Sequence, residues 1–220
     1  MRDIRRIKAA VFDLDGTLFD STAAWEGLGE RYLSGLGITP EPGLDEKLRC
    51  MTLPDGSEYL RTAYRLPFPA GQIQADILRG IERFYISECT LKPGARELLE
   101  LLSARGVRSA AATAGDRRLA CAALKRLGVL EFFAGIFTCE EYGSKHSPGI
   151  FIAAASAAGG EPENTAVFED SLHCILTAKS AGFITAAVYD SSEPQQEALM
   201  HAADVYCESP AEYARLFREP

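Results

Sequence analysis

Short apolar runs separated by helical stretches constrain the fold of this chain most strongly. Six runs rich in Val, Ile, Phe and Ala occur at residues 8–13, 107–113, 135–138, 165–169, 184–189 and 203–206. Most of them are separated by helical patterns, which is typical of β-α-β units on a parallel sheet. One such pattern covers residues 93–105, where Leu98, Leu99 and Leu102 form a stripe that Gly106 ends. The sequence therefore predicts an α/β fold with a parallel sheet.

The interval between the first two apolar runs is too long for a simple connection. It has no clear strand pattern, although a crossover between parallel strands needs only about a dozen residues. Helical spacing relates Trp25, Leu28, Tyr32 and Leu36, and helical patterns also cover residues 59–64 and 72–88. We therefore expect a helical domain over residues 19–90, hinged near 19–21 and 90–94, inserted into a core domain formed by residues 1–18 and 91–220.

Two carboxylates end the first apolar run. Asp13 and Asp15 flank Leu14 and precede Gly16. In an extended chain the two side chains point to the same side, roughly 7 Å apart along the strand. Two desolvated carboxylates repel each other, and Mg²⁺, which prefers oxygen ligands, would remove that repulsion. The alternative is that both residues only cap a turn, since Asp-Gly is a common turn signal.

Three further polar positions follow apolar runs. Thr113 closes the second run and leads into the turn Ala114-Gly115-Asp116, Lys145 lies in a loop, and Glu169 and Asp170 end the fourth run. Each has a local explanation as a helix cap or a solvated loop residue. Together they bring a hydroxyl, a cation and two acids to the carboxyl ends of parallel strands, where open α/β sheets bind ligands.

Composition restricts the partners and the compartment. The chain has 220 residues, 47% of them hydrophobic, and a formal net charge of -8. This charge argues against a nucleic acid or an anionic membrane as partner, because both are bound through basic patches. An anionic substrate must instead be attracted locally, by a metal, a lysine and helix N-termini. Six dispersed cysteines without a Cys-x-x-Cys pattern, and no signal peptide or bilayer-length apolar run, favour a cytoplasmic protein with reduced thiols.

Taken in chain order, these positions resemble the four motifs of the haloacid dehalogenase (HAD) superfamily. The matching residues are Asp-Leu-Asp-Gly-Thr at 13–17, Thr113, Lys145 and Phe-Glu-Asp-Ser at 168–171. The resemblance covers the whole chain, and the insertion resembles the helical C1 cap of the subgroup that includes phosphoglycolate phosphatase and β-phosphoglucomutase. It implies a Rossmann-like core with strand order 5-4-1-2-3, in which Asp13 and Asp170 face the same crevice.

The resemblance also implies a mechanism. Asp13 attacks phosphorus to give an aspartyl-phosphate, while Asp15 protonates the leaving oxygen and later activates the hydrolytic water. Mg²⁺ is held by the Asp13 side chain, the Asp15 carbonyl and Asp170, and Glu169 supports this metal site. Residues Thr113 and Lys145 bind the transferring oxygens, and the backbone amide of Ala114 adds a donor.

Two motifs depart from the family pattern. The third usually reads Lys-Pro-x-Pro-Asp, but His146 and Gly149 stand where its first proline and its aspartate are found. The fourth usually has a glycine at the position of Cys174. We expect His146 to be a solvent-facing loop residue and Cys174 to be a packing residue.

Asp15 separates the reactions known in the family. True dehalogenases lack this second aspartate, so the sequence favours hydrolysis of a small phosphate monoester. A β-phosphoglucomutase-like phosphomutase is the alternative, but such enzymes carry a cap histidine at the position of Trp25 and a basic residue in the cap loop, whereas residues 50–60 contain no Lys or Arg. A HAD-fold protein that binds a phosphorylated ligand or a partner without turnover is the alternative from another class.

The cap loop is expected to determine the substrate. Residues 49–57 form this loop, with Arg49 and Trp25 as candidate contacts to a small phosphorylated metabolite. Trp25 is equally compatible with a place in the core of the helical domain. We expect a monomer or a weak homodimer, and the sequence leaves the ester itself unidentified.

Overall fold

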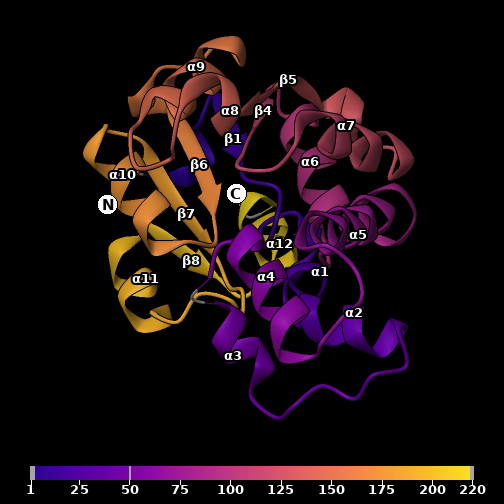
Figure 1. Ribbon diagram of the computed structural model, residues 1–220. Coiled ribbons are helices and arrows are strands. Elements are labelled where there is room, and N and C mark those ends of the chain that lie inside the picture. Colours follow the sequence, from indigo (N-terminus) through magenta and orange to yellow (C-terminus); the bar gives the residue numbers. More distant parts are fainter. Residues whose placement is uncertain (1–2, 50, 219–220) are drawn as a thin grey trace. The chain divides into compact units, whose positions relative to one another are not determined.

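The computed structural model describes residues 3–49 and 51–218 and divides into two compact units (Figure 1). The sheet unit comprises Met1–Thr22 and Cys89–Pro220, and the helical unit comprises Ala23–Glu88. The chain therefore passes between the units twice, after Thr22 and after Glu88.

A parallel sheet of six strands forms the sheet unit, which confirms the predicted α/β class. Its strands are β1 (Ala9–Phe12), β4 (Arg108–Thr113), β5 (Phe133–Thr138), β6 (Thr165–Glu169), β7 (Ile184–Val188) and β8 (Val205–Cys207), in the order β5-β4-β1-β6-β7-β8. Strand β1 lies between β4 and β6, with Val11 opposite Ala110 on one side and Val167 on the other. The residues that follow β1, β4 and β6 consequently meet at one edge of the sheet.

The strand order extends the predicted one by a strand. The order 5-4-1-2-3 is present in the first five strands of the sheet, and β8 pairs with β7 as a sixth strand at the edge. The apolar run at residues 203–206 corresponds to this strand, whereas the family pattern does not include it. The addition leaves the central position of β1 unchanged.

Helices cover both faces of the sheet (Figure 1). Alternating side chains of β1 divide between the faces, as expected for a strand buried on both sides. On one face, Val11 and Val167 belong to a buried cluster with Phe151 of α9 (Gly149–Ala157) and Cys174 of α10 (Leu172–Ser180). On the other face, Phe12 stacks on Phe168 with ring centroids 4.3 Å apart, and Phe168 meets the edge of the Tyr213 ring.

The remaining elements of the sheet unit connect these strands. They are η1 (Ile4–Arg6), α6 (Ala95–Ala104), α7 (Arg117–Arg126), η3 (Leu130–Phe132), α8 (Cys139–Tyr142), η4 (Pro162–Asn164), α11 (Gln196–Ala202) and α12 (Pro210–Arg218). Two short strands, β2 (Phe19–Asp20) and β3 (Thr90–Leu91), pair antiparallel where the chain leaves and re-enters the unit. The predicted helix at 93–105 is thus α6, shorter by one or two residues at each end.

Short helices build the helical unit. They are α1 (Thr22–Trp25), which begins in the sheet unit, α2 (Leu28–Gly35), α3 (Leu44–Arg49), α4 (Leu53–Ala63), α5 (Ala70–Arg83) and the π-helical turn η2 (Phe84–Glu88). The face of α5 that carries Ile73, Ile77 and Ile81 is buried, as the helical spacing of these residues predicts. This unit accounts for the long interval between the first two strands of the parallel sheet.

A single helix through Trp25 and Leu36 is a wrong prediction. Gly27 adopts a left-handed conformation, with φ of 63°, and separates α1 from α2. Trp25 is 48% exposed and Leu36 is 41% exposed, whereas Leu33 is fully buried. Because the helix is interrupted at Gly27, Trp25 and Leu36 do not lie on one continuous helix. The spacing of the apolar residues from Trp25 to Leu36 therefore does not define the buried face of α2.

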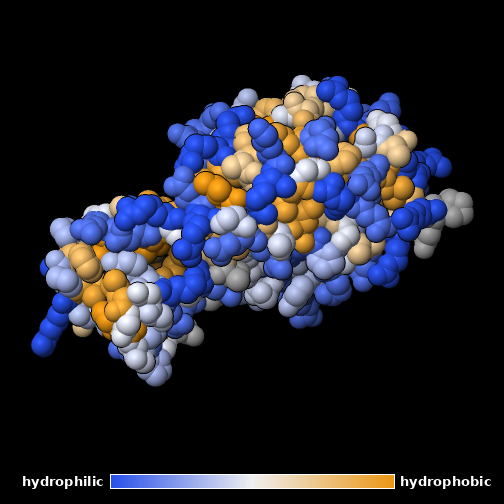
Figure 2. Space-filling view, turned by 90° about the vertical axis from the view of Figure 1, so that its right-hand side faces the viewer, coloured by the Kyte–Doolittle hydropathy of each residue, from blue (hydrophilic) through white to orange (hydrophobic). Residues whose placement is uncertain are grey.

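The molecular surface drawn in Figure 2 is largely hydrophilic, with hydrophobic side chains showing between the polar ones. Within residues 3–49 and 51–218, no helix combines the length and the hydrophobicity that crossing a membrane requires. The exposed large apolar side chains include Leu176 on α10, which is 51% exposed.

Removal of the Phe168 ring tests the packing that holds the sheet. We expect Phe168→Ala to lower the free energy of unfolding by about 3–5 kcal/mol, because it leaves a cavity between β1 and α12. The matched control is Leu176→Ala at an exposed position of α10, which should change the free energy by less than about 1 kcal/mol. Urea titration followed by circular dichroism measures both, and similar losses for the two variants would contradict this description of the core.

Candidate active site

The loop after β1 carries the first two carboxylates. The strand ends at Phe12, and the Asp13 N–H donates to the Phe168 carbonyl at 2.9 Å, which extends the pairing with β6 by one residue. The amides of Leu18 and Phe19 both bond to the Leu14 carbonyl, at 2.9 and 2.7 Å. The chain therefore turns back immediately, and the expectation that Asp13 and Asp15 lie on one extended strand is wrong.

Gly16 permits this turn and a close approach to the fourth motif. Its φ is 78°, and a Cβ at this position would lie 2.9 Å from Cγ of Asp170. The next residue, Thr17, is buried and its hydroxyl donates to the Asp170 carboxylate at 3.2 Å. Both the backbone conformation and the nearby carboxylate therefore require glycine at residue 16.

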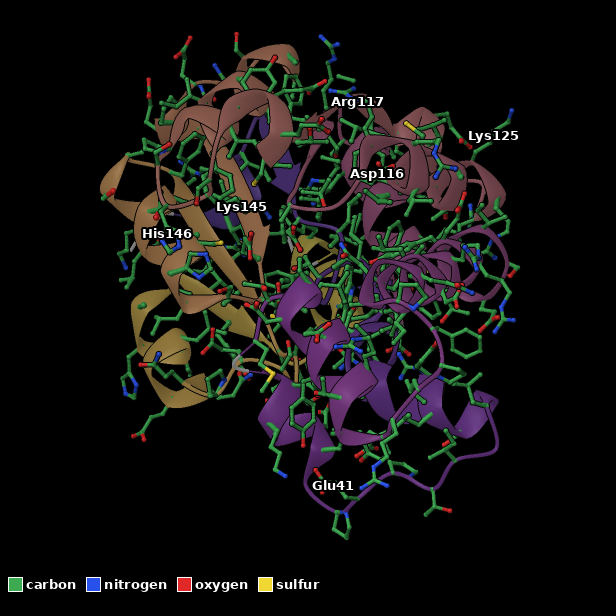
Figure 3. The ribbon with its side chains drawn as sticks, in the orientation of Figure 1. Glu41, Asp116, Arg117, Lys125, Lys145 and His146 are labelled. Atoms are coloured by element: carbon green, nitrogen blue, oxygen red, sulfur yellow. The ribbon has the colours of Figure 1, made fainter. Side chains whose placement is uncertain are left out.

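Lys145 joins the first motif to the fourth. It lies in the loop between α8 and α9, and its ammonium is buried, forming ion pairs with Asp13 and, at 2.7 Å, with Glu169 (Figure 3). A buried ammonium must be paired with acids, and here it contacts two. The lysine predicted from the sequence therefore reaches the carboxylate predicted as the nucleophile.

Both carboxylate oxygens of Glu169 are engaged. One accepts from Lys145, and the other accepts from the amides of Asp170 and Ser171, at 3.1 and 3.2 Å. These amides lie at the N-terminus of α10, where backbone N–H groups lack helical partners. Glu169 thus positions Lys145 and anchors the start of α10.

Thr113 terminates β4 beside Asp15. Its hydroxyl accepts a hydrogen bond from the Gly115 N–H at 2.9 Å. A Cβ on Gly115 would lie 3.4 Å from the Asp15 carboxylate, so the turn after β4 approaches the second aspartate closely. Ala114 lies between these residues and is exposed.

One cavity of about 250 Å³ collects these positions. Its lining includes all seven of the predicted core-domain residues, namely Asp13, Asp15, Thr113, Ala114, Lys145, Glu169 and Asp170. Four further lining residues were not anticipated: Cys139, Ser144, Ser171 and His173. Ser171 is the last residue of the fourth motif, His173 follows it by two residues and Ser144 directly precedes Lys145, so proximity in sequence to a motif was the available signal for these three. Cys139, at the start of α8, has no such signal.

Burial and like charges perturb the protonation of this cluster. Burial raises the pKa of Asp13 to about 8, helped by Glu169 and Asp15 and opposed by Lys145. Burial likewise raises the pKa of Asp170 well above its usual value, with contributions from Glu169 and Asp13. Burial disfavours the charged form of Lys145, but Asp13 and Glu169 outweigh it and hold the lysine pKa well above its usual value. The lysine is therefore an ammonium, and the raised pKa values of Asp13 and Asp170 mean that a further cation would compete with protons at these two acids.

The acids could hold a divalent cation. Ligand oxygens of Asp13, Glu169 and Asp170 lie within 4.8 Å of one another. Once ionised, these three carboxylates beside the single ammonium of Lys145 carry two negative charges in excess, which one divalent cation balances. The oxygen-only donor set suits a hard cation. The residues present thus fit the metal that the family pattern implies.

Two histidines lie beside this cavity. His146 is exposed and stacks on His173, with ring centroids 4.5 Å apart (Figure 3 labels His146). His173 in turn lies 3.2 Å from the Cys174 sulfur and 2.7 Å from the Ser171 hydroxyl. Burial raises the pKa of the Cys174 thiol, which belongs to the core cluster. These positions agree with a solvent-facing His146 and a packing role for Cys174.

The predicted cap contacts lie in the helical unit. The Trp25 indole N–H donates to the Tyr85 hydroxyl at 2.9 Å. The side chain of Arg49 lies outside the part of the chain that the structure describes, as does all of Cys50. Their predicted contacts with substrate stay predictions.

Comparison with known proteins identifies the family. The model of the haloacid dehalogenase-like hydrolases matches residues 7–182, a span that includes all four motifs. The chain belongs to this family. Its subgroup holds phosphatases and β-phosphoglucomutases.

Individual relatives extend over most of this HAD chain. It is 25% identical over 214 residues to phosphorylated carbohydrates phosphatase of Thermotoga maritima, covering 97% of this chain and 99% of the relative. It is 31% identical over 182 residues to validoxylamine A 7'-phosphate phosphatase of Streptomyces hygroscopicus, covering 80% and 82%. A solved Thermotoga maritima structure agrees with a TM-score of 0.84 at 24% identity, covering 96% and 99%, and so supports the HAD fold.

Cation binding by this HAD protein should depend on pH. Because the pKa of Asp13 is raised to about 8 and that of Asp170 is raised as well, a divalent cation competes with protons at these acids, and its affinity rises with pH. We expect the apparent Kd for Mg²⁺ to fall several-fold per pH unit between about pH 6 and 8. Calorimetry in buffers of different ionisation enthalpy measures both the Kd and the protons released.

The matched control for this titration is Asp116→Asn. Asp116 caps α7, accepting from the Leu119 N–H at 2.9 Å, and asparagine caps helices equally well. The variant should reproduce the wild-type profile. A pH-independent affinity without proton release would show that the acids are already ionised in the free protein.

Proposed function

We propose that this HAD enzyme is a Mg²⁺-dependent phosphatase that hydrolyses a small phosphate monoester through an aspartyl-phosphate. The observation that supports this most strongly is the buried contact of Lys145 with Asp13 beside a group of acids. In this contact the Lys145 ammonium pairs with the proposed nucleophile Asp13, and the same ammonium can attract the negative charge of an incoming phosphate. An anionic ester gains little attraction from the chain as a whole, whose net charge is -8.

Asp13 begins the reaction as the nucleophile. One of its carboxylate oxygens forms a bond to phosphorus, and the bond from phosphorus to the ester oxygen breaks. Lys145 and Thr113 contact the oxygens of the transferring group, where negative charge is concentrated. Lys145 already pairs with Asp13, so it also fixes the direction of that side chain.

Asp15 moves the proton. It gives its proton to the leaving oxygen in the first step and takes one from the attacking water in the second. The water forms a bond to phosphorus, phosphate leaves, and Asp13 returns to its carboxylate form. Asp15 lies beside the turn after β4 and lines the same cavity as Asp13 and Lys145.

Asp13, Asp170 and the Asp15 carbonyl are the proposed Mg²⁺ ligands. When bound, the metal neutralises the repulsion between the nucleophile and the phosphate and lowers the pKa of its carboxylate ligands. Glu169 supports this site from its hydrogen bonds to Lys145 and the start of α10. The donor set of three nearby carboxylates is the observation that supports the metal.

The names of the relatives support a sugar phosphate or a related small metabolite as the substrate class. Phosphorylated carbohydrates and validoxylamine A 7'-phosphate are the substrates that two relatives' names give. In this proposal the helical unit acts as the cap that selects the leaving group, with Trp25 and Arg49 as contacts. The proposed enzyme is cytoplasmic and is a monomer or a weak homodimer.

A phosphomutase is the alternative supported by a specific comparison. The chain is 27% identical to β-phosphoglucomutase of Mycobacterium tuberculosis over 235 residues, covering 91% of this chain and 88% of the relative. A mutase returns the phosphoryl group to a sugar, whereas a phosphatase transfers it to water. The products therefore distinguish the two reactions.

Turnover should require both Asp13 and Mg²⁺. We expect wild-type protein to release phosphate from at least one member of a panel of sugar phosphates, nucleotides and phosphoglycolate. Asp13→Asn should lower kcat at least about a thousandfold, because an amide is a poor nucleophile. Excess chelator should have a similar effect, and Asp116→Asn should retain activity because it changes only a helix cap. Phosphate release measures all four.

The same panel separates the alternatives. Equal turnover by wild type and Asp13→Asn would contradict the proposed nucleophile, and absence of turnover on every ester would favour a binding protein. For the mutase, β-glucose 1-phosphate with a bisphosphate activator should yield glucose 6-phosphate. Free glucose and phosphate as the sole products would exclude the mutase for this sugar.

A further inference from the structure

Asp190 is a buried carboxylate that the proposed chemistry does not use. It follows β7 by two residues and is 3% exposed. The hydroxyl of Thr22 donates to both of its oxygens at 2.9 Å, and the Lys92 ammonium donates to one of them at 2.8 Å. The amide and hydroxyl of Ser192 donate to the other oxygen, at 3.0 and 2.7 Å. Both oxygens are thus committed to protein donors.

Two of these donors lie on the two chain crossings between the units. Thr22 is the last residue of the sheet unit before the chain enters the helical unit, and Lys92 follows the return at Cys89 by three residues. The crossings also pair with each other through β2 and β3, and the Lys92 N–H donates to the Leu18 carbonyl at 2.8 Å. A single carboxylate therefore ties the base of both crossings to the end of β7.

The same carboxylate lies against the catalytic loop. A Cβ on Gly16 would lie 3.3 Å from Cγ of Asp190 and 2.9 Å from Cγ of Asp170. Gly16 directly follows Asp15, the proposed proton donor. Gly16 thus lies close to both Asp190 and the proposed metal ligand Asp170.

The charge of Asp190 is neutralised within this network. Burial opposes ionisation, but the hydrogen bonds from Lys92 and Ser192 outweigh it and hold the pKa of Asp190 below its usual value. Lys92 is itself mostly buried, with an 11% exposed side chain. A buried pair of this kind is strongly destabilised when one partner is removed.

We propose that Asp190 is a positioning residue that clamps both crossings to the catalytic end of the sheet. The two crossings are the points at which the helical unit is connected to the sheet unit. Asp190 fixes the positions of these two points relative to the loop of Asp13 and Asp15. This role rests on the proposed function, because it matters for turnover only if the helical unit selects the substrate. Asp190 acts through the crossings and contacts neither the phosphate nor the metal.

Hydrogen exchange of the full chain tests the clamp without reference to activity. In Asp190→Asn, amides of residues 16–22 and 89–94 should exchange at least about tenfold faster, because local opening becomes easier. Amides of residues 108–113 and 165–169, in the central strands, should keep their protection. Thr22→Val, which removes one donor, should affect the same two segments to a smaller extent.

Asp204 provides a matched control. It accepts from the amide and hydroxyl of Thr185, both at 3.0 Å, and pairs with Lys179 at 3.4 Å, at the opposite end of β7. It therefore has the same kinds of partners without touching a crossing. Asp204→Asn should leave exchange at 16–22 and 89–94 unchanged.

Kinetics give the functional readout. For the best sugar phosphate, Asp190→Asn should lower kcat/KM by about ten- to a hundredfold, the scale of a substrate that is poorly positioned for reaction. For acetyl phosphate, whose leaving group is too small to need selection by the helical unit, the change should stay within about threefold. Asp204→Asn should change neither value by more than about threefold.

Two results would overturn the clamp. The first is unchanged exchange at both crossings in Asp190→Asn and Thr22→Val. The second is faster exchange throughout the central strands in Asp190→Asn, which would show that Asp190 stabilises the whole fold and does not act specifically on the crossings. If exchange becomes faster only at the crossings but Asp190→Asn lowers kcat/KM equally for the sugar phosphate and for acetyl phosphate, Asp190 has no role in substrate selection. If wild-type protein turns over no ester, the proposed function fails, while the exchange data still decide the clamp.

Discussion

The buried ammonium of Lys145 is the interaction on which the site depends. It lies between Asp13 and Glu169 and joins the loop after β1 to the end of β6. Without a cation at this point, two carboxylates would repel each other in a region from which water is largely excluded. The lysine partly neutralises the acids and leaves an excess of negative charge that a divalent cation can balance. One side chain thus organises the nucleophile, its neighbours and the attraction for an anionic substrate.

The fold supplies this arrangement through the central place of β1. Because β4 and β6 pair with β1 on either side, the residues after these strands meet at one edge of the sheet. Gly16 then brings the catalytic loop against Asp170, and the amides at the start of α10 hold Glu169. The acids are fixed by the backbone on which they lie, which limits how far the cluster can relax when its charge changes.

The sequence predicted the parts that local chemistry determines. The six apolar runs correspond to the six strands of the sheet. The order of the motifs predicted that Asp13, Thr113, Lys145 and Asp170 share one site, and these four residues line one cavity. Asp13 and Asp15 were expected on one extended strand, because the apolar run does not show that the chain turns at Gly16. The break at Gly27 was missed because helical spacing continues across it. Asp190 was missed because its partners Thr22 and Lys92 are distant in sequence, which no local pattern carries. His173 was missed although it lies two residues after the fourth motif.

The proposed mechanism requires Asp13 to carry the phosphoryl group during turnover. Acid quenching of the wild-type enzyme during turnover, reduction with borohydride and peptide mass spectrometry test it directly, since reduction converts an aspartyl-phosphate to homoserine. Homoserine is expected at position 13 in the presence of substrate and Mg²⁺, and none without substrate. Homoserine at position 15, or turnover without any modified aspartate under conditions that trap acyl phosphates, would contradict it.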